Sequence, residues 1–162
     1  MTDWDSIIRA HGPMVFGTAW RILGHAADTE DVVQEVFLEA YRLRADSVRS
    51  WPGLLRRLAA CRALDRLRQR KPTLSLHGLD LASSEDGPEA TAIGRELADR
   101  LRQAVAELPG REGQVFCLRY FEDLSYQQIA EALAVSSGAV ATALHKARAK
   151  LEALLTEAAK GD

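Results

Sequence analysis

A stretch rich in proline, glycine and serine divides this chain of 162 residues into two parts. It runs from Pro72 to about Pro88 without a sustained helical period, and we interpret it as a linker. Outside it, apolar residues mostly recur with the helical period, and neither flanking part alternates as strands do. The expected fold is all-α. It has two small helical domains, residues 1–71 and 95–162, joined by a flexible linker, residues 72–94.

The composition excludes several classes of protein. At 47% apolar and 27% charged residues the chain is an ordinary globular protein, and no apolar run approaches the roughly 20 residues of a membrane helix. The acidic start lacks a secretory signal, so we expect a cytoplasmic protein without membrane insertion. Cys61 and Cys117 are too few for a disulfide scaffold. The four histidines are scattered and no enzyme motif occurs, so we expect no catalytic residues, metal or cofactor.

The first part predicts three helical stretches. Residues 3–23 form a helix or a pair of helices interrupted near Gly12 and Pro13. Asp28 is a suitable N-cap for a helix to about Arg44. Its core stripe comprises Val33, Val36, Phe37, Ala40 and Leu43.

The third stretch follows Ser50 and ends at about Arg70, and it is strongly basic. Residues 54–71 carry seven basic side chains against Asp65 alone, a net charge of +6. Such a block attracts polyanions by counterion release. The alternative is a solvated helix face. With one acid for seven bases, we favour a nucleic-acid surface.

The second part predicts a helix-turn-helix. A helix over residues 89–107 and a short helix over 111–120 precede a capping box formed by Ser125 and Gln128. A three-residue turn, 134–136, then leads into a long last helix capped by Ser136. The face left free for a DNA major groove carries Ser137, Gly138, Ala141, Thr142 and His145, flanked by Lys146 and Arg148. Helical hairpins of inert bundles can mimic this pattern.

Two sets of segments carry a family resemblance. The segment from Asp28 to Phe37 (DTEDVVQEVF) resembles region 2.2 of sigma-70-family RNA polymerase sigma factors, and Ala63 to Arg70 (ALDRLRQR) resembles the end of region 2.4. The second part of the chain resembles region 4 of the same family over Leu108–Tyr120, Leu124–Leu133 and Val140–Leu151. With only regions 2 and 4 and a linker, the chain resembles the small extracytoplasmic-function (ECF) group.

The resemblance implies the function of a transcription initiation factor and its partners. These are core RNA polymerase, contacted through the β′ clamp helices and the β flap, promoter DNA, and an anti-sigma factor. The positions matching the clamp-helix surface are Asp28, Glu30, Asp31, Gln34 and Glu35. Alternatively, acidic residues are simply favoured near a helix N-terminus by the helix dipole. That alternative explains Asp28, Glu30 and Asp31 but not Glu35, which lies past the first turn.

The resemblance also implies how the promoter is read. The exposed face of the last helix, described above, matches the surface that reads the −35 element in the family. The loop over residues 44–50 matches the one that captures an unpaired base of the −10 element, and the basic helix matches the surface that holds the non-template strand. Trp51 could stack on a base, although we favour packing. The implied −10 contacts are Arg49, Trp51, Arg56, Arg57, Arg62, Asp65, Arg66, Arg68 and Arg70.

The chain departs from the family pattern in three places. Cys61 and Arg62 replace a common Arg-Asn, and we interpret Cys61 as a buried filler, with redox sensing as the alternative. Ala134 replaces a glycine and costs roughly 1 kcal/mol if its φ is positive. The residues over 141–143 lack two basic groups, which predicts weaker −35 contacts. A different class remains possible, a stand-alone helix-turn-helix regulator that dimerises on a palindromic site.

Overall fold

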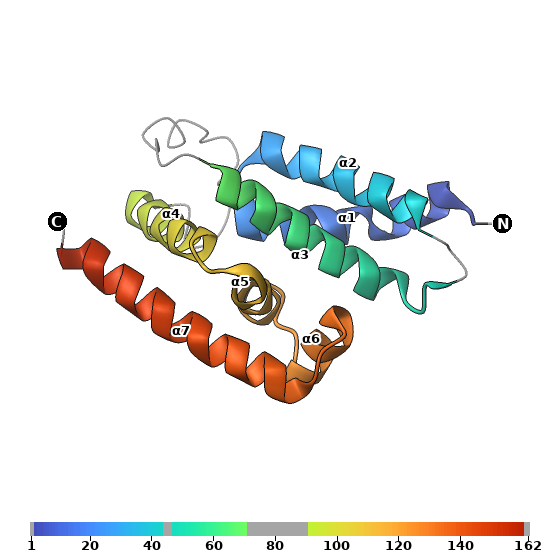
Figure 1. Ribbon diagram of the computed structural model, residues 1–162. Helices are drawn as coiled ribbons and strands as arrows, with labels where there is room; N and C mark the ends of the chain where they lie inside the picture. Colours follow the sequence, from blue (N-terminus) through green and yellow to red (C-terminus); the bar gives the residue numbers. More distant parts are fainter. Residues whose placement is uncertain (1, 44–46, 71–90, 161–162) are drawn as a thin grey trace.

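The computed structural model describes residues 2–43, 47–70 and 91–160, and every regular element in these ranges is helical (Figure 1). Of the linker predicted over 72–94, only the last four residues lie within the described ranges. Docking of leucines 74, 76, 79 and 81 on one of the modules is a hypothesis suggested by their place in an otherwise polar segment, and these residues lie outside the described ranges. The first module holds α1 (Trp4–Leu23), α2 (Ala26–Arg42) and α3 (Trp51–Gln69). The second module holds α4 (Ala92–Ala106), α5 (Gly110–Phe116), η5 (Cys117–Phe121), α6 (Tyr126–Leu133) and α7 (Ser137–Lys160).

Helix α1 is continuous, so the interruption predicted near Gly12 and Pro13 is wrong. Proline removes one backbone donor from a helix, and that loss is costly only where the freed carbonyl is buried. Pro13 is exposed, as is Arg9 one turn earlier, so the carbonyl that loses its donor is accessible to solvent. Asp3 caps the first turn by accepting from the Ser6 amide, and Gly24 ends the helix with a φ of 61°.

Helix α2 begins three residues earlier than predicted. His25, rather than Asp28, is the N-cap, because its Nδ1 accepts from the Asp28 amide at 3.3 Å. Asp28 therefore lies inside the first turn. The buried stripe includes the predicted Val36, Phe37 and Ala40, whereas Leu43 is exposed.

The second module follows the predicted order of elements. The capping box of Ser125 and Gln128 is present, and Ser136 accepts from the Ala139 amide at the start of α7. The short helix widens into the π-helical turn η5. In α4 the apolar residues Ile93, Leu97, Leu101 and Val105 recur with the helical period, which predicts one stripe facing the core. Val105 is buried, but Ile93 and Leu97 are 73% and 59% exposed, so the first half of that prediction is wrong.

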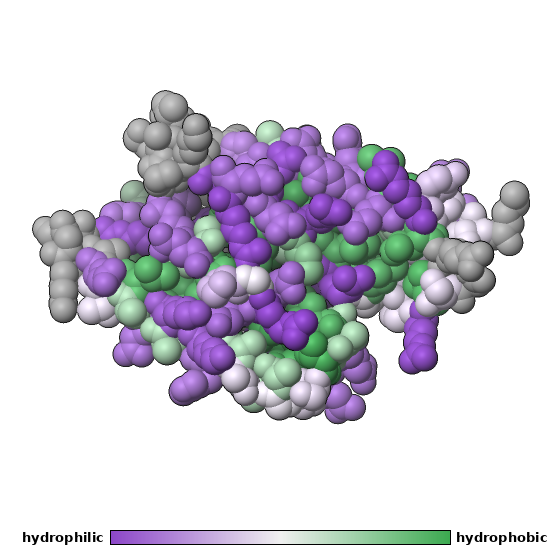
Figure 2. Space-filling model, in the orientation of Figure 1, coloured by the Kyte–Doolittle hydropathy of each residue, from purple (hydrophilic) through white to green (hydrophobic). Residues whose placement is uncertain are grey.

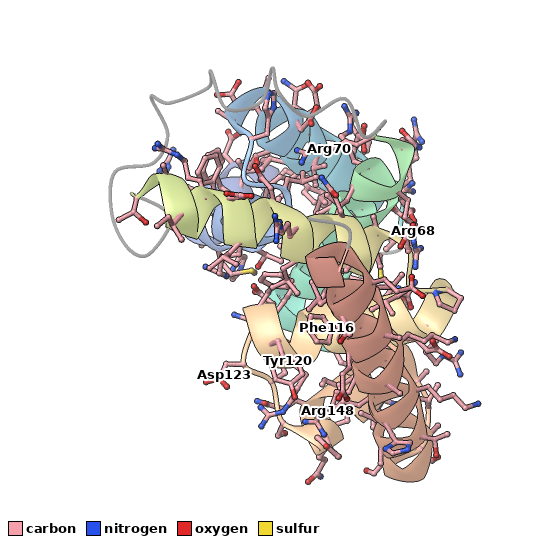
Figure 3. All side chains as sticks on the ribbon, turned by 90° about the vertical axis from the view of Figure 1, so that its left-hand side faces the viewer. Arg68, Arg70, Phe116, Tyr120, Asp123 and Arg148 are labelled. Atoms are coloured by element: carbon pink, nitrogen blue, oxygen red, sulfur yellow. The ribbon has the colours of Figure 1, made fainter. Side chains whose placement is uncertain are left out.

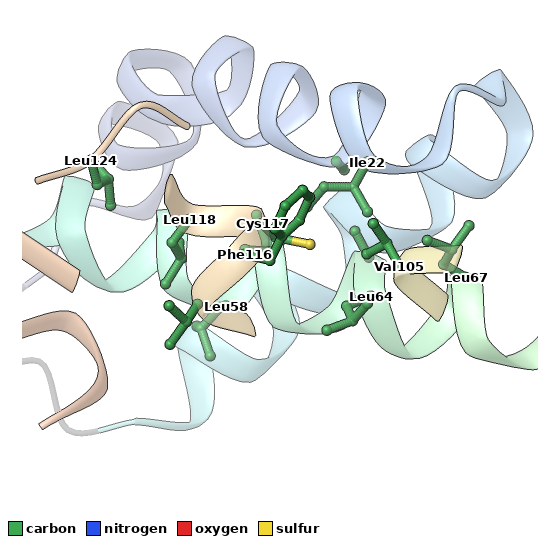
Figure 4. Close-up of a cluster of buried hydrophobic side chains, with 14 of the residues drawn as sticks. Ile22, Leu58, Leu64, Leu67, Val105, Phe116, Cys117, Leu118 and Leu124 are labelled. Carbon is green, nitrogen blue, oxygen red and sulfur yellow. The ribbon is translucent and has the colours of Figure 1, made fainter. Parts of the chain in front are cut away.

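One hydrophobic cluster runs through both modules. Helix α3 lies between α1 and α2 on one side and the second module on the other (Figure 1). Figure 4 shows Ile22 of α1 and Leu64 of α3 in the same cluster as Val105, Phe116 and Leu118 of the second module. The two parts separated by the linker therefore share a core.

Ala134 provides a test of the turn between α6 and α7. Its φ is 56° and its ψ is 47°, a conformation that strains any residue with a Cβ. We expect Ala134→Gly to raise the free energy of unfolding by about 1 kcal/mol. The control Ala132→Gly, inside α6, should lower it by about 1 kcal/mol. Urea unfolding followed by circular dichroism measures both, and a loss of stability in Ala134→Gly would contradict the assigned strain.

Gly24 tests the join between the modules. A Cβ on Gly24 would lie 2.4 Å from Cζ of Arg102, and its φ is positive. We therefore expect Gly24→Ala to lower the free energy of unfolding by about 2–3 kcal/mol. Gly12 serves as the control, because a Cβ at that position would meet open space, and Gly12→Ala should gain about 1 kcal/mol. Thermal unfolding of the two variants should shift in opposite directions.

Candidate nucleic-acid interface and docking surface

Arg66 on α3 is the centre of an ion-pair cluster with α2. Its guanidinium lies 2.7 Å from Glu35, 3.2 Å from Asp31 and 3.6 Å from Asp28. The hydrogen bond to Glu35 raises the pKa of Arg66. Three of the predicted polymerase-binding carboxylates therefore face a predicted DNA-binding arginine.

The same arrangement repeats one turn before and after Arg66. Arg62 donates to Glu39 at 2.8 Å, which raises the pKa of Arg62. Arg70 donates to Asp28 at 3.0 Å. Figure 2 shows the resulting polar surface over α2 and α3 as a mainly purple band across the top of the molecule. The basic face of α3 is thus largely paired, because the acids come from the neighbouring helix.

The remaining α3 arginines differ in their partners. Arg56 forms an ion pair with Glu122 at 3.3 Å, and Arg68 donates to the carbonyl oxygens of Leu108 and Gly110 at 2.9 and 3.2 Å. Arg57 makes no ion pair with the described residues. Asp65 is exposed and lies 3.5 Å from Arg68.

A cavity of about 700 Å³ lies where the start of α3 faces α6. Arg49, Arg56 and Arg57 line it from the first module, and Gln128 and Glu131 line it from α6. Of the predicted base-capturing loop, residues 44–46 lie outside the described ranges, whereas 47–50 line this cavity. Basic side chains and a polar wall make it suited to an anionic, unpaired strand.

Trp51 packs within the first module. Its ring lies 5.3 Å from that of Trp4 in an edge-on arrangement, and Trp4 also contacts Tyr41 at 5.3 Å. The side chain is half-buried. This geometry agrees with the packing interpretation that we favoured.

The part of the α2 surface that stays accessible is apolar as well as acidic. Glu30 and Gln34 are exposed, and Gln34 lines a groove of about 370 Å³ between α1 and α2. The groove continues over Leu38 and Tyr41, which are 57% and 65% exposed. Leu38 lies off the predicted core stripe of α2. An exposed leucine beside an exposed tyrosine is the signal that could have identified this groove.

The helix-turn-helix face is presented to solvent. A helix-turn-helix needs a small residue and apolar residues where its two helices meet. Ala130 and Val140 fill these places and are buried, and Val135 in the turn is half-buried. The predicted contact residues Ser137, Gly138, Ala141, Thr142, His145 and Lys146 are all exposed. Figure 2 shows the surface around α6 and the start of α7 as mainly white and green, with few strongly polar residues.

Arg148 is the exception on that face, because it is already engaged. It donates to the hydroxyl of Tyr120 at 2.6 Å and lies over the tyrosine ring at 5.4 Å (Figure 3). The hydrogen bond raises the pKa of Arg148. The aromatic residues Phe116, Tyr120 and Phe121 are typical of a domain core, but Tyr120 is 48% exposed, whereas Phe116 is buried.

Glu122 is a functional candidate that sequence reasoning missed. It follows η5, and only 1% of its side chain is exposed. It accepts from the hydroxyl of Thr18 and from Arg21 at 2.8 and 3.0 Å, both on α1, and pairs with Arg56 on α3. A single acid in a loop carries no periodic signal, so only the tertiary structure reveals this site.

Both cysteines are free, and their pKa values argue against easy oxidation. Burial raises the pKa of the Cys61 thiol, which is half-buried, and strongly raises that of the buried Cys117. A raised pKa lowers the thiolate population on which oxidation depends. Among the described residues, no group of three potential metal ligands comes together, and no helix is long and apolar enough to cross a membrane.

Comparison with known proteins identifies two family regions. Residues 7–73 match the model of Sigma-70 region 2, and residues 98–151 match that of Sigma-70, region 4. The ECF RNA polymerase sigma factor SigW of Bacillus subtilis is 30% identical, over 93% of this chain and 88% of its own. The ECF RNA polymerase sigma factor SigE of Mycolicibacterium smegmatis is 29% identical, over 97% of this chain and 63% of its own.

A solved structure has a similar fold. It is the sigma factor RpoE in complex with the anti-sigma factor NepR from Bartonella quintana, with a TM-score of 0.57 and 16% identity over 96% of this chain and 98% of that one. The match to region 2 disfavours the alternative of a stand-alone helix-turn-helix regulator, which needs no such region.

The Arg66 cluster is testable by stability measurements. We expect Arg66→Gln to lower the free energy of unfolding by about 1–2 kcal/mol, because it leaves three carboxylates facing one another without a cation. The loss should shrink in high salt, which screens that repulsion. Arg57→Gln on the same helix is the matched control and should change stability little. Equal effects of the two substitutions would show that the cluster contributes nothing to the free energy of unfolding.

Proposed function

The chain belongs to the ECF group of the sigma-70 family of RNA polymerase sigma factors, and on that basis we propose how its surfaces divide the work of initiation. A sigma factor binds core RNA polymerase and directs it to promoters. We assign polymerase docking and −10 melting to residues 1–71, and −35 reading to residues 95–162, with residues 72–94 as the tether. The supporting observation is that one chain carries region 2 and region 4 in this order, with an exposed helix-turn-helix face.

The polymerase-docking surface lies on α2 and extends into the apolar groove. Glu30 and Gln34 are accessible, and Leu38 and Tyr41 provide area for burial against a partner helix. A mainly apolar groove with acids along one side suits the β′ clamp helices, if their polar side chains are basic. Asp28, Asp31 and Glu35 support this surface by anchoring α2 to α3, and they can exchange partners when the polymerase binds.

The −10 surface lies on α3 and the loop before it. Arg49 and Arg57 are the residues available to the non-template strand at once, because they line the cavity at the start of α3 without an ion pair in the described structure. Phosphates compete for the paired arginines, Arg62, Arg66 and Arg70, by exchange for carboxylates. Unstacked bases need such a groove because flipping them costs free energy.

The −35 surface is the first half of α7. Its start carries small side chains, Ser137, Gly138 and Ala141, which allow a close approach to a major groove. Thr142 and His145 follow on the same face and can reach base edges, and Lys146 and Arg148 can reach phosphates. To reach a phosphate, Arg148 must break its hydrogen bond to Tyr120, or the two side chains must move together. The second module also provides the contact to the β flap.

Regulation and location follow from the same membership. We propose an anti-sigma factor as a further partner, as in the complex of the structurally similar sigma factor. The chain performs no covalent chemistry, which core polymerase supplies, and it acts in the cytoplasm together with that enzyme.

Docking is tested by co-elution with purified bacterial core RNA polymerase. We expect the wild type to co-elute and Leu38→Glu to lose at least about tenfold in affinity, because it places a charge in the apolar groove. Phe16→Glu, at an exposed aromatic outside the groove, is the control and should bind as the wild type does. A double reversal of Asp31 and Glu35 is a poorer test, since it also breaks the Arg66 cluster. Failure of the wild type to bind would overturn the proposed function.

A further inference from the structure

Arg148 of α7 differs from the paired arginines of α3 in what holds its side chain. Arg56, Arg62 and Arg66 each meet a carboxylate, which fixes the guanidinium but also neutralises its charge. Arg148 meets a neutral phenol instead, because its Nε donates to the hydroxyl of Tyr120 at 2.6 Å and its guanidinium lies 5.4 Å from the ring centroid. It forms no ion pair with the part of the chain that the structure describes. The contact therefore orders Arg148 and leaves its charge for another anion.

Tyr120 is itself fixed from behind. Its ring lies 4.6 Å from that of Phe116, which is buried. Tyr120 belongs to the π-helical turn η5, in which the amide of Glu122 donates to the carbonyl oxygen of Cys117, five residues before it. Such widened turns are frequent at functional sites. Figure 3 shows Phe116, Tyr120 and Arg148 in this order, so the buried ring supports the tyrosine that holds the arginine.

Tyr120 uses only part of the hydrogen-bonding capacity of Arg148. A guanidinium has more N–H donors than one hydroxyl can accept, and the two terminal nitrogens carry most of them. The hydrogen bond from Tyr120 raises the pKa of Arg148, and Tyr126 adds to this effect. Because Arg148 is exposed, its terminal nitrogens can donate to a ligand while Nε stays bound to Tyr120. Of the two ways in which Arg148 can reach a phosphate, this geometry favours the one that keeps the two side chains together.

The position of Arg148 along α7 indicates which part of a DNA duplex it meets. It follows Ala141 by seven residues, or two turns, so the two residues share a side of the helix about 10 Å apart along its axis. Ala141 belongs to the face proposed to enter the major groove, which is about 12 Å wide. A long side chain two turns farther along can reach the phosphates that border the groove. Residues 137–150 contain no acid that would oppose this approach.

We propose that Tyr120 is a positioning residue for promoter binding, whose uncharged hydroxyl holds Arg148 in place to donate to a phosphate beside the −35 element. This role rests on the proposed function, in which α7 reads that element. An arginine that is already held loses less side-chain freedom on binding, so its phosphate contact is stronger than that of a mobile arginine. The contact compensates in part for the two basic groups that residues 141–143 lack relative to the family pattern.

A double-mutant cycle on the holoenzyme, core RNA polymerase with this chain bound, tests the role. The wild-type holoenzyme first selects a promoter duplex from a random library, and the dissociation constant for that duplex is then measured for each variant. Tyr120→Phe keeps the ring and removes only the acceptor, and we expect it to weaken binding about threefold to tenfold. Arg148→Gln should weaken binding at least as much and lower the slope of log K against log salt by about one. In the Arg148→Gln background, Tyr120→Phe should have no further effect.

Lys146→Gln provides the matched background. Lys146 is exposed on the same helix and is also proposed to contact a phosphate, so Tyr120→Phe should lose the same factor with or without it. Sequence preference is a second readout, because loss of a phosphate contact weakens binding to all sequences alike. The penalties for single base changes in the −35 element should therefore be the same in the wild type and in Tyr120→Phe. Urea unfolding followed by circular dichroism verifies that each variant is folded.

Three results would overturn the proposal. An undiminished effect of Tyr120→Phe in the Arg148→Gln background would show that the tyrosine acts without the arginine. Altered base penalties in Tyr120→Phe would show that the hydroxyl orients α7 as a whole rather than one side chain. A wild-type holoenzyme that selects no promoter would overturn the proposed function and this role with it, and that failure is distinguishable because it precedes any comparison of variants.

Discussion

The structure depends on helix α3, which is buried on two sides. Its apolar residues are not confined to one stripe. Leu55, Ala59 and Ala63 are fully buried, and Leu58 and Leu64 reach the cluster shared with the second module. A helix with two apolar sides must be covered twice to keep both from water. The three-helix bundle covers one side, and the second module, returning across the linker, covers the other.

The ion pairs of the α3 arginines follow from the position of α3 between the two modules' other helices. Because two sides of α3 are covered, its arginines project along the boundaries of those contacts and meet whichever acids or carbonyls the neighbours provide. Along one boundary, Arg66 meets the acids of α2, and along the other, Arg56 meets Glu122. Pairing a guanidinium with a carboxylate is favourable but exchangeable, since a phosphate offers a similar geometry. The residues proposed for DNA and for polymerase are thus coupled before either partner is present.

Local elements could be predicted from the sequence because their causes are local. The capping box at Ser125 depends on residues three apart, and the apolar period of α7 needs only its own residues. The errors arise where a neighbour decides. His25 rather than Asp28 is the cap, because its Nδ1 accepts from the Asp28 amide, and Pro13 lies inside a helix at an exposed position, where water can reach the freed carbonyl. Ile93 and Leu97 show that helical period alone does not say whether a partner covers the stripe.

The sequence by itself determined the helical class, the division at the linker, the helix-turn-helix and the family resemblance, because each is written in spacing or residue type along one segment. It also indicated the charge of α3, which is a count. Only the tertiary structure decided which of these charges are paired, that the modules share a core, and that Glu122 is buried among partners more than 60 residues away in the chain, such as Arg56. Pairing and burial depend on distances between segments remote in sequence, and composition along the chain contains no information on those distances.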